Sequence, residues 1–187
     1  MLKKSNKNKA KYDKIGKAMN EVSDSLKLRP TQAEDVDFVL SLERHPDNRP
    51  FILQWSRDEH LCSIEFDSHE HYIIESTLTG DRLGYIIVYN LVEKGLGVYI
   101  KRIVVGEKSR RIGRNALRLV LERAFHDLKA LTVYLAVFPD NKRAQRSYRA
   151  MGFTRATLLP QEYLELENAV GGFPENSLLM YAWPRSR

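Results

Sequence analysis

The sequence predicts an α/β fold in which helices flank a mixed, largely antiparallel sheet. Apolar and β-branched runs separated by Gly/Asp turns fill residues 71–105, and an amphipathic helix follows at 113–125. A nearly continuous apolar run at 131–138 then predicts a buried strand. Consecutive hairpin strands are antiparallel, whereas a strand reached through a helix is parallel to its neighbour, so the sheet contains both pairings.

The segment before the hairpins predicts a strand followed by two helices. Residues 26–30 alternate as a short strand, and Thr31 with Glu34 forms a capping-box pattern that opens a helix to about Leu42. Ser56 is expected to cap the second helix. The apolar positions expected to face inward on that helix are Leu61, Ile64 and Phe66.

The hairpin region and the C-terminal part complete the predicted sheet. A helix capped by Asn141 is expected to end near Gly152, and Gly171, Gly172 and Pro174 lie in a loop. The predicted strands are 71–77, 83–92, 98–105, 131–138, 153–158 and 177–183.

The positive charge of the chain is concentrated at one end. Residues 1–20 hold seven lysines against Asp13, which equals the net charge of +6 for all 187 residues. We therefore expect residues 1–25 to be a basic, flexible tail and residues 26–187 to be a single domain that is neutral overall. The alternative for the tail is an arm that contacts an acidic partner or nucleic acid. The domain is neutral and shows no nucleic-acid recognition motif, so no specific nucleic-acid partner is expected.

The cysteine content and hydropathy predict a cytoplasmic protein. The chain has one cysteine, Cys62, and no signal peptide or apolar run of membrane-spanning length. Cys62 is expected to be a core residue rather than a nucleophile. His60, His69 and His71 lack recognised metal-ligand spacing, so no metal is expected. A monomer and a homodimer are both left open.

A basic turn at the start of the central helix has the features of a phosphate site. The first turn of a helix offers backbone N–H groups without intrahelical partners, and the helix dipole adds positive potential. Cationic side chains strengthen such contacts. A solvated basic surface is the alternative. The residues expected at this cradle are Lys108, Ser109, Arg110, Arg111, Ile112, Gly113 and Arg114.

This turn resembles the Gln/Arg-x-x-Gly-x-Gly/Ala signature of the GNAT N-acetyltransferase superfamily. Gly113 occupies its signature position, but Lys108 replaces Gln or Arg and Arg111 replaces the first glycine. Since arginine disfavours positive φ, we expect either a negative φ at Arg111 or a slightly different bend of the loop.

A second segment strengthens the resemblance. Residues 141–153 match the superfamily pattern Asn-x-x-Ala-x-x-x-Tyr-x-x-x-Gly-Phe, and the matching positions include Arg143 and Ala144. The resemblance implies a V-shaped splay between two central strands that accepts the pantetheine arm of acetyl-CoA. It further implies that Asn141 contacts the arm and that Tyr148 protonates the departing thiolate. Backbone N–H groups near Ile103, Val104 and Val105 would hold the arm and the carbonyl oxygen.

The implied activity is direct acetyl transfer to a primary amine of a small molecule or a protein N-terminus. A non-catalytic acyl-CoA sensor on the same fold is the alternative. The strand at 97–102 lacks an acid, so Glu65, Glu75, Glu93 or a water chain is left as the general base. Glu75 and Trp55 are expected near the acceptor, although Trp55 fits a core position equally well.

Overall fold

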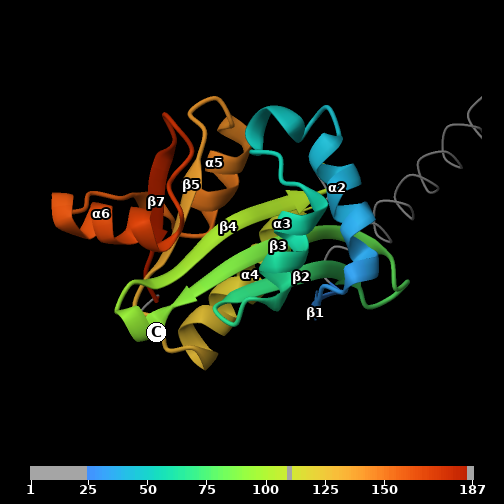
Figure 1. The fold of residues 1–187 in the computed structure, drawn as a ribbon, viewed down its shortest axis with the longest axis horizontal. Coiled ribbons are helices and arrows are strands. Elements are labelled where there is room, and N and C mark those ends of the chain that lie inside the picture. The colour runs from blue at the N-terminus through green and yellow to red at the C-terminus, as the bar shows by residue number, and fades with distance from the viewer. Residues whose placement is uncertain (1–24, 109–110, 185–187) are drawn as a thin grey trace, which may run out of the picture.

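A seven-stranded sheet in the order β1-β2-β3-β4-β5-β7-β6 organises the described part of the chain, residues 25–108 and 111–184 of a computed structural model (Figure 1). All neighbouring strands are antiparallel except β4 and β5, which are parallel. The predicted mixed, largely antiparallel sheet is thus confirmed. The strands are β1 (Leu26–Pro30), β2 (His69–Ser76), β3 (Arg82–Leu91), β4 (Gly97–Val105), β5 (Val133–Val137), β6 (Thr154–Arg155) and β7 (Leu178–Ala182).

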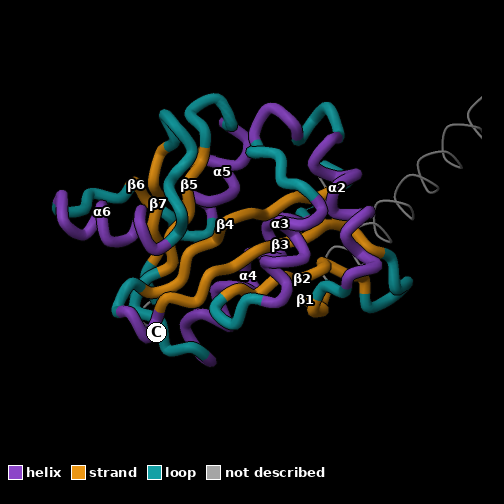
Figure 2. Tube along the Cα trace, in the orientation of Figure 1, coloured by secondary structure: helices purple, strands orange, loops and turns teal. Residues whose placement is uncertain are grey.

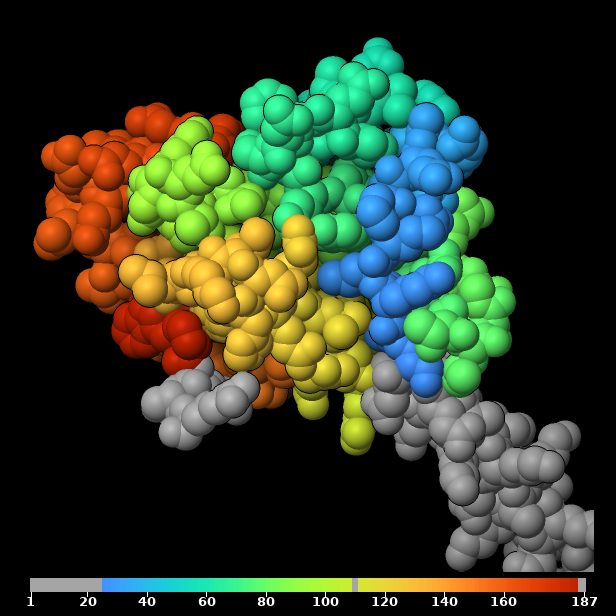
Figure 3. Space-filling model, turned by 90° about the horizontal axis from the view of Figure 1, so that it is seen from below, coloured from blue at the N-terminus to red at the C-terminus, as the bar shows by residue number. Residues whose placement is uncertain are grey.

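Helices cover both faces of the sheet. Apolar residues of α4 and α5 pack with Ile86 and Ile100 on one face. Residues of α2 and α6 pack with Tyr85 and Tyr99 on the other, where α2 and α3 lie in front of the sheet in Figure 1. Figure 3, seen from below, shows the atoms of α4 and of the residues after it (yellow) at the surface of the molecule. The helices are α2 (Val36–Arg44), α3 (Arg57–Glu65), α4 (Ile112–Glu122), α5 (Lys142–Ala150) and α6 (Pro160–Ala169).

Strand β4 pairs very differently with its two neighbours. Its ladder with β3 runs from Gly97 to Val105 and is interrupted by a bulge, because Arg102 pairs with Ile87 and Ile100 with Val88. Lys101 is therefore the extra residue of the bulge. The ladder with β5, in contrast, extends only over residues 98–100 of β4. Beyond Ile100 the two strands diverge, which confirms the expected V-shaped splay (Figure 1).

The closed end of the V is held at Gly97. The N–H of Val98 donates to the carbonyl of Thr132 at 3.0 Å. Gly97 has φ +73°, and a Cβ at this position would lie 2.3 Å from the same carbonyl oxygen. Only glycine accommodates both the left-handed φ and this close approach of the two strands.

Two predicted helix starts have different outcomes. Ser56 caps α3 as predicted, since its Oγ accepts from the N–H of Glu59 at 3.2 Å and its own N–H donates to the Glu59 carboxylate at 2.6 Å. The capping box predicted at Thr31 and Glu34 is displaced by one residue: the N–H of Gln32 donates to Asp35, at 3.0 Å. The Thr31 hydroxyl is instead 2.9 Å from Nδ1 of His71.

The inward face of α3 is polar, contrary to the prediction. His60 and Ser63 are buried, whereas Cys62 is exposed and Phe66 is 59% exposed. The expectation that Cys62 and Phe66 face the core is therefore wrong. The physical reason is that a buried carboxylate on α2, described below, lies opposite His60 and determines which side of α3 turns inward.

The C-terminal part contains a helix that the apolar pattern did not predict. Helix α6 begins with Pro160, and the N–H of Leu159 donates to the Glu162 carboxylate at 2.8 Å. The strand expected at 153–158 is reduced to Thr154–Arg155. Residues 1–24, which carry the predicted basic tail, lie outside the described residues. No helix in the described ranges is long and apolar enough to cross a membrane.

Candidate active site

A cavity of about 480 Å³ occupies the open side of the V. One wall is β4, and the opposite wall is the end of β5 with α5. The start of α4 lies at one end of the cavity. Residues of the loop between α2 and α3 also line it, and Figure 2 shows this loop near α5. The cavity therefore connects the α4 side of the sheet with the α2 side.

The start of α4 has the geometry of an anion cradle, with an unusual residue at its N-cap. Arg111 adopts φ +58° and ψ 0°, the left-handed conformation that glycine tolerates best. Of the two alternatives for this position, a negative φ is wrong, because Arg111 adopts a conformation that is common only for glycine. Its side chain is exposed. Ser109 and Arg110, predicted in the same loop, lie outside the described residues.

Gly113 lies in the first turn of α4 without a structural need for glycine. A Cβ added there would meet only Val105 Cγ1, at an ordinary 3.7 Å. The fold itself thus accepts alanine at this position. A glycine that the packing does not require, at a helix N-terminus inside a cavity, fits a backbone that a phosphate approaches closely.

Cations dominate this end of the cavity. Lys108 donates from Nζ to the carbonyl of Val105 at 2.7 Å and to Oδ1 of Asn48, so it ties the loop after α2 to the end of β4. Burial, together with the charge of Arg143, lowers the pKa of Lys108 to about 8. The acids that line the cavity are Asp47 and Glu107. The exposed arginines that line it are Arg111, Arg114, Arg143 and Arg146.

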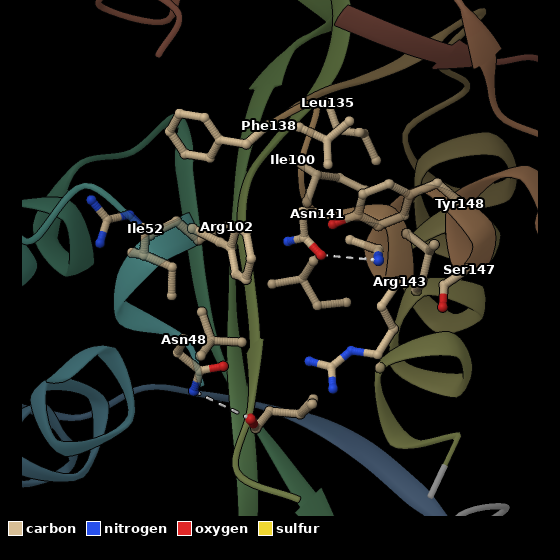
Figure 4. A pocket seen from close by; sticks show the side chains of 18 of the residues that line it. Asn48, Ile52, Ile100, Arg102, Leu135, Phe138, Asn141, Arg143, Ser147 and Tyr148 are labelled. Atoms are coloured by element: carbon tan, nitrogen blue, oxygen red, sulfur yellow. Dashed lines mark hydrogen bonds between the residues drawn. The ribbon is translucent and has the colours of Figure 1, made fainter. Parts of the chain in front are cut away.

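Helix α5 presents two of the predicted residues to the cavity. Asn141 caps the helix, since its Oδ1 accepts from the N–H of Ala144 at 3.1 Å. The Tyr148 hydroxyl points across the cavity toward β4 (Figure 4). Among the described residues this hydroxyl has no hydrogen-bond partner. Burial raises the pKa of Tyr148 to about 12, so the phenol is protonated at neutral pH.

The β4 wall supplies backbone groups at its open end. Ile103, Val104 and Val105 line the cavity beyond the last described pairing of β4 with β5. The backbone N–H and C=O groups on that side of β4 consequently have no strand partner there. An extended ligand with amide groups matches this edge as an added strand would.

Two residues predicted near the acceptor do not line the cavity. Glu75 is at the outer side of the sheet, where Lys27 at 2.7 Å and Arg29 at 2.8 Å neutralise it. Trp55 packs behind the wall, with its ring 4.0 Å from the Arg102 guanidinium. The structure therefore does not bring Glu75 to the site, and it favours the core alternative for Trp55. Ile52 and Tyr99 belong to the core on the α2 side and line the cavity. Other residues that line it are Phe51, Leu53, Lys101, Arg102, Phe138 and Pro174.

The remaining candidates for a general base also lie elsewhere. Glu65 ends α3 and is exposed. Glu93 is exposed in the turn that precedes β4. Neither lines the cavity.

Sequence reasoning missed a buried charge cluster behind the α2 side of the cavity. Glu43, fully buried on α2, accepts from Arg102 and from the Tyr85 hydroxyl, and its Oε2 accepts from the N–H of Trp55 at 3.2 Å. Burial alone would raise the pKa of Glu43, but His60, Arg102 and Tyr85 outweigh it and hold the pKa at about 2. Figure 4 shows Arg102 directed away from Tyr148, toward the α2 side.

A spacing argument would have found Glu43. It lies seven residues after Val36 and three or four after Leu40 and Val39, which are all buried. A carboxylate on the apolar stripe of a helix requires a buried partner. Because Arg102 lies far from Glu43 in the sequence, the pattern alone does not identify it as this partner.

The three histidines considered as metal ligands do not share one site. His60 Nε2 lies 3.3 Å from Glu43, and His60 Nδ1 lies 3.2 Å from His71 Nε2. His69 instead stacks on Tyr89 with ring centroids 3.8 Å apart. Within residues 25–108 and 111–184, no group of three or more His, Cys, Asp or Glu residues is arranged to hold a metal ion.

Together, the splayed strands, the basic helix start and the cavity between them define a class of enzyme that binds coenzyme A within an open sheet. Comparison with known proteins agrees. The model of the acetyltransferase (GNAT) family matches residues 35–153. Spermidine N(1)-acetyltransferase of Escherichia coli K12 is 23% identical over 150 residues, covering 74% of this chain and 78% of that protein.

Solved structures show the same fold. Spermidine N-acetyltransferase from Vibrio cholerae, in complex with CoA and spermine, superposes with a TM-score of 0.64 at 18% identity, covering 85% of this chain and 95% of that one. A domain from Methanocaldococcus jannaschii has a TM-score of 0.64 at 16% identity, with coverage of 84% and 97%. The chain belongs to the acetyltransferase (GNAT) family. It is an acetyl-CoA-dependent amine N-acetyltransferase.

Proposed function

We propose that the enzyme transfers the acetyl group directly to a primary amine that enters from the α2 side of the sheet. One observation carries the proposal: a single cavity joins the basic start of α4 to the α2 side, and the Tyr148 hydroxyl points into it. Both substrates reach the same space from opposite faces. Direct attack then needs no covalent enzyme intermediate. The exposed Cys62 lies on α3, outside the cavity lining.

The phosphate groups of acetyl-CoA are proposed to bind at the start of α4. The N–H groups of the first helical turn and the surrounding cations complement a pyrophosphate. Asn141 and the free edge of β4 at Ile103 to Val105 are proposed to hold the pantetheine arm, because both offer polar groups along the cavity. The proposed phosphate contacts are Lys108, Ser109, Arg110, Arg111, Ile112, Gly113, Arg114 and Arg143, with Ala144 beside them on α5.

Tyr148 is proposed as the general acid. A phenol with a pKa near 12 is fully protonated at neutral pH and donates to a thiolate as the carbon–sulfur bond breaks. The lack of a described hydrogen-bond partner leaves the hydroxyl available. The proton of the attacking amine leaves through water, since the carboxylates that line the described cavity, Asp47 and Glu107, are at the phosphate end.

A small-molecule amine is the proposed acceptor. The names of the curated relatives, which are spermidine acetyltransferases, support it. A protein N-terminus is the second acceptor class to test. The boundaries 26–187 for one domain and a cytoplasmic location are proposed with this function, and the mass in solution decides between a monomer and a homodimer.

Two measurements test the proposal. Calorimetry with coenzyme A is expected to give a dissociation constant below millimolar, and a weaker value contradicts the cradle. A thiol-release assay over primary amines and short peptides is then expected to show turnover with at least one small amine. Tight binding of acetyl-CoA without thiol release from any amine would instead indicate an acyl-CoA sensor.

A further inference from the structure

Lys101 occupies a special place in the cavity. It is the extra residue of the β4 bulge and lines the cavity half-buried. Its Nζ donates to the carbonyl of Val170 at 2.9 Å and lies 5.7 Å from the centre of the Tyr89 ring. Tyr89 and Val170 both belong to the core on the α2 side of the sheet. The bulge therefore places an ammonium group on the side from which the amine is proposed to enter.

The described residues offer this ammonium no counter-charge. Among residues 25–108 and 111–184, no carboxylate forms an ion pair with Lys101. The neighbouring cation, Arg102, is already paired with Glu43. Burial and the charge of Arg102 lower the pKa of Lys101, as expected for a cation that lacks an anion. One of the three ammonium hydrogens is used by Val170, which leaves two for a ligand.

The phosphates of acetyl-CoA do not account for Lys101. They are proposed to bind at the start of α4, on the other face of the sheet, where Arg111, Arg114 and Arg143 already line the cavity. The carboxylates that line the cavity are also at that end: Glu107 adjoins Lys108 in sequence, and Asp47 is close enough to influence the Lys108 pKa. The α2 side thus has an unpaired cation, apolar walls and no carboxylate among its described lining residues.

A polyamine is a poor match for these walls. Once one amine is placed for acetylation, its other ammonium groups need carboxylates nearby, and Lys101 repels them. An amine that also carries a carboxylate matches the same walls, because the carboxylate pairs with Lys101 in a partly desolvated setting.

We propose that the acceptor is a primary amine bearing a carboxylate, and that Lys101 binds this carboxylate while the amine faces the thioester. The inference rests on the proposed function and narrows it. It also separates this chain from the spermidine acetyltransferases it resembles, whose names give a polycationic acceptor.

Matched acceptors test the charge preference. We would measure kcat/KM for 5-aminopentanoate and 5-aminopentanamide, for phenylalanine and phenylalaninamide, and for spermidine. In at least one matched pair, the enzyme is expected to favour the carboxylate over the carboxamide by about tenfold or more, the scale of one charge-assisted contact. Spermidine is expected to be the weaker acceptor.

Variants of Lys101 separate recognition from a structural tether. Lys101→Gln keeps a hydrogen-bond donor for Val170 but loses the charge, so the carboxylate-to-carboxamide ratio is expected to fall about tenfold. Lys101→Arg keeps the charge and is expected to retain the preference. Comparing this ratio between variants cancels differences in amine reactivity and in cofactor binding. Lys94→Gln, an exposed lysine outside the cavity lining, is the matched control and is expected to leave the ratio unchanged.

Three results would overturn the inference: no carboxylate preference in the unmodified enzyme, spermidine as the best acceptor, or an unchanged ratio in Lys101→Gln. Failure of the proposed function is distinguishable, because then no amine releases thiol. In that case the matched acceptors are titrated into the coenzyme A complex by calorimetry. Tighter binding of the carboxylate that depends on Lys101 supports the site, and equal binding of both members of each pair rejects it.

Discussion

The two ends of the cavity use arginine in opposite ways. At the α4 end, Arg111, Arg114 and Arg143 are exposed and have no ion-pair partner among the described carboxylates. At the α2 end, the side chain of Arg102 is 6% exposed and is paired with Glu43, whose side chain is fully buried. Exposed cations without partners can exchange water for a mobile anion, whereas a buried pair is already neutral. The first arrangement suits ligand binding, and the second fixes a wall.

The largest expected effect comes from removing the buried ion pair at the α2 end of the cavity. Glu43→Gln keeps the side-chain shape but leaves Arg102 buried without a counter-charge, which is expected to lower the free energy of unfolding by about 3–5 kcal/mol. Urea denaturation measures this loss. Asp37→Asn is the control on the same helix, because it removes an exposed ion pair with Arg57 and is expected to cost less than about 1 kcal/mol. Equal losses in the two variants would contradict the contrast between buried and exposed pairs.

The second-largest effect is expected on turnover, at the Tyr148 hydroxyl. Tyr148→Phe removes the proposed acid while preserving the ring, so kcat is expected to fall about hundredfold. The dissociation constant for coenzyme A is expected to change by less than about threefold, since one neutral hydrogen bond at most is lost. Steady-state kinetics and calorimetry measure the two quantities. Tyr163→Phe, on the exposed face of α6, is expected to behave as the unmodified enzyme. Normal turnover in Tyr148→Phe would exclude the acid role.

Low pH is expected to lower the free energy of unfolding through the buried His71. Burial, with the charges of His60 and Arg102, lowers the pKa of His71 from 6.5 to about 3. Between these values the unfolded chain binds a proton that the folded chain does not. The free energy of unfolding therefore falls as the pH drops below about 6.5, by up to about 1.4 kcal/mol per pH unit.

Unfolding by urea between pH 7.5 and 4.5 measures this slope. Below about pH 4.5 Glu43 is expected to add to it, because its folded pKa of about 2 is also below the value of 4.5 for an unperturbed glutamate. His71→Gln is expected to flatten the slope between pH 6.5 and 4.5. The exposed His126→Gln serves as the control and should retain it. An equal slope in both variants would show that His71 is not the group responsible.

At the α4 end, Gly113→Ala is expected to separate stability from affinity. The added Cβ has room beside Val105, and alanine favours the helix, so the melting temperature is expected to stay equal or rise. The same Cβ occupies the approach to the first-turn N–H groups, so the affinity for coenzyme A is expected to fall about tenfold. Unchanged affinity would mean that the cofactor does not approach Gly113.

The smallest effect is expected at Arg111. Arg111→Gly removes a left-handed arginine that costs roughly 1–2 kcal/mol, and the extra flexibility of unfolded glycine offsets about 1 kcal/mol of this. A net gain of about 0.5 kcal/mol in the free energy of unfolding is expected. Arg111→Ala loses the same charge but retains a Cβ at φ +58°, so no gain is expected. Equal stability of the two variants would argue against backbone strain at this position.

Local patterns in the sequence predicted most of the framework. The hairpin strands, α4 and the Asn141 cap of α5 depend on short-range periodicity and on one side chain contacting a nearby N–H, and the structure confirms them. Helix α6 was missed because most of it is exposed, with Leu166 its single buried residue, so no apolar stripe marks it. Pro160 followed by Glu162 was the available signal.

The site was predictable only where motifs determine positions. The cradle and α5 residues with described positions line the cavity. Trp55 and Glu75 do not, since their surroundings depend on partners far away in sequence: Arg102 for Trp55 and residues 27 and 29 for Glu75. Arg102 and Glu43 are likewise 59 positions apart, and pattern analysis of a single segment does not reveal such a pair.

The backbone at Gly97, at the closed end of the V, influences the position of Val105 at the open end. Strands β4 and β5 are held together next to Gly97 and diverge beyond Ile100. At roughly 3.3 Å per residue, Val105 lies about 26 Å from Gly97. A lever of that length turns a rotation of about 2° at Gly97 into a shift of about 1 Å at Val105. Displacements of this size are large for reacting groups that must meet in line. The alignment of acetyl donor and amine is thus set partly at the far end of the strand, where neither substrate binds.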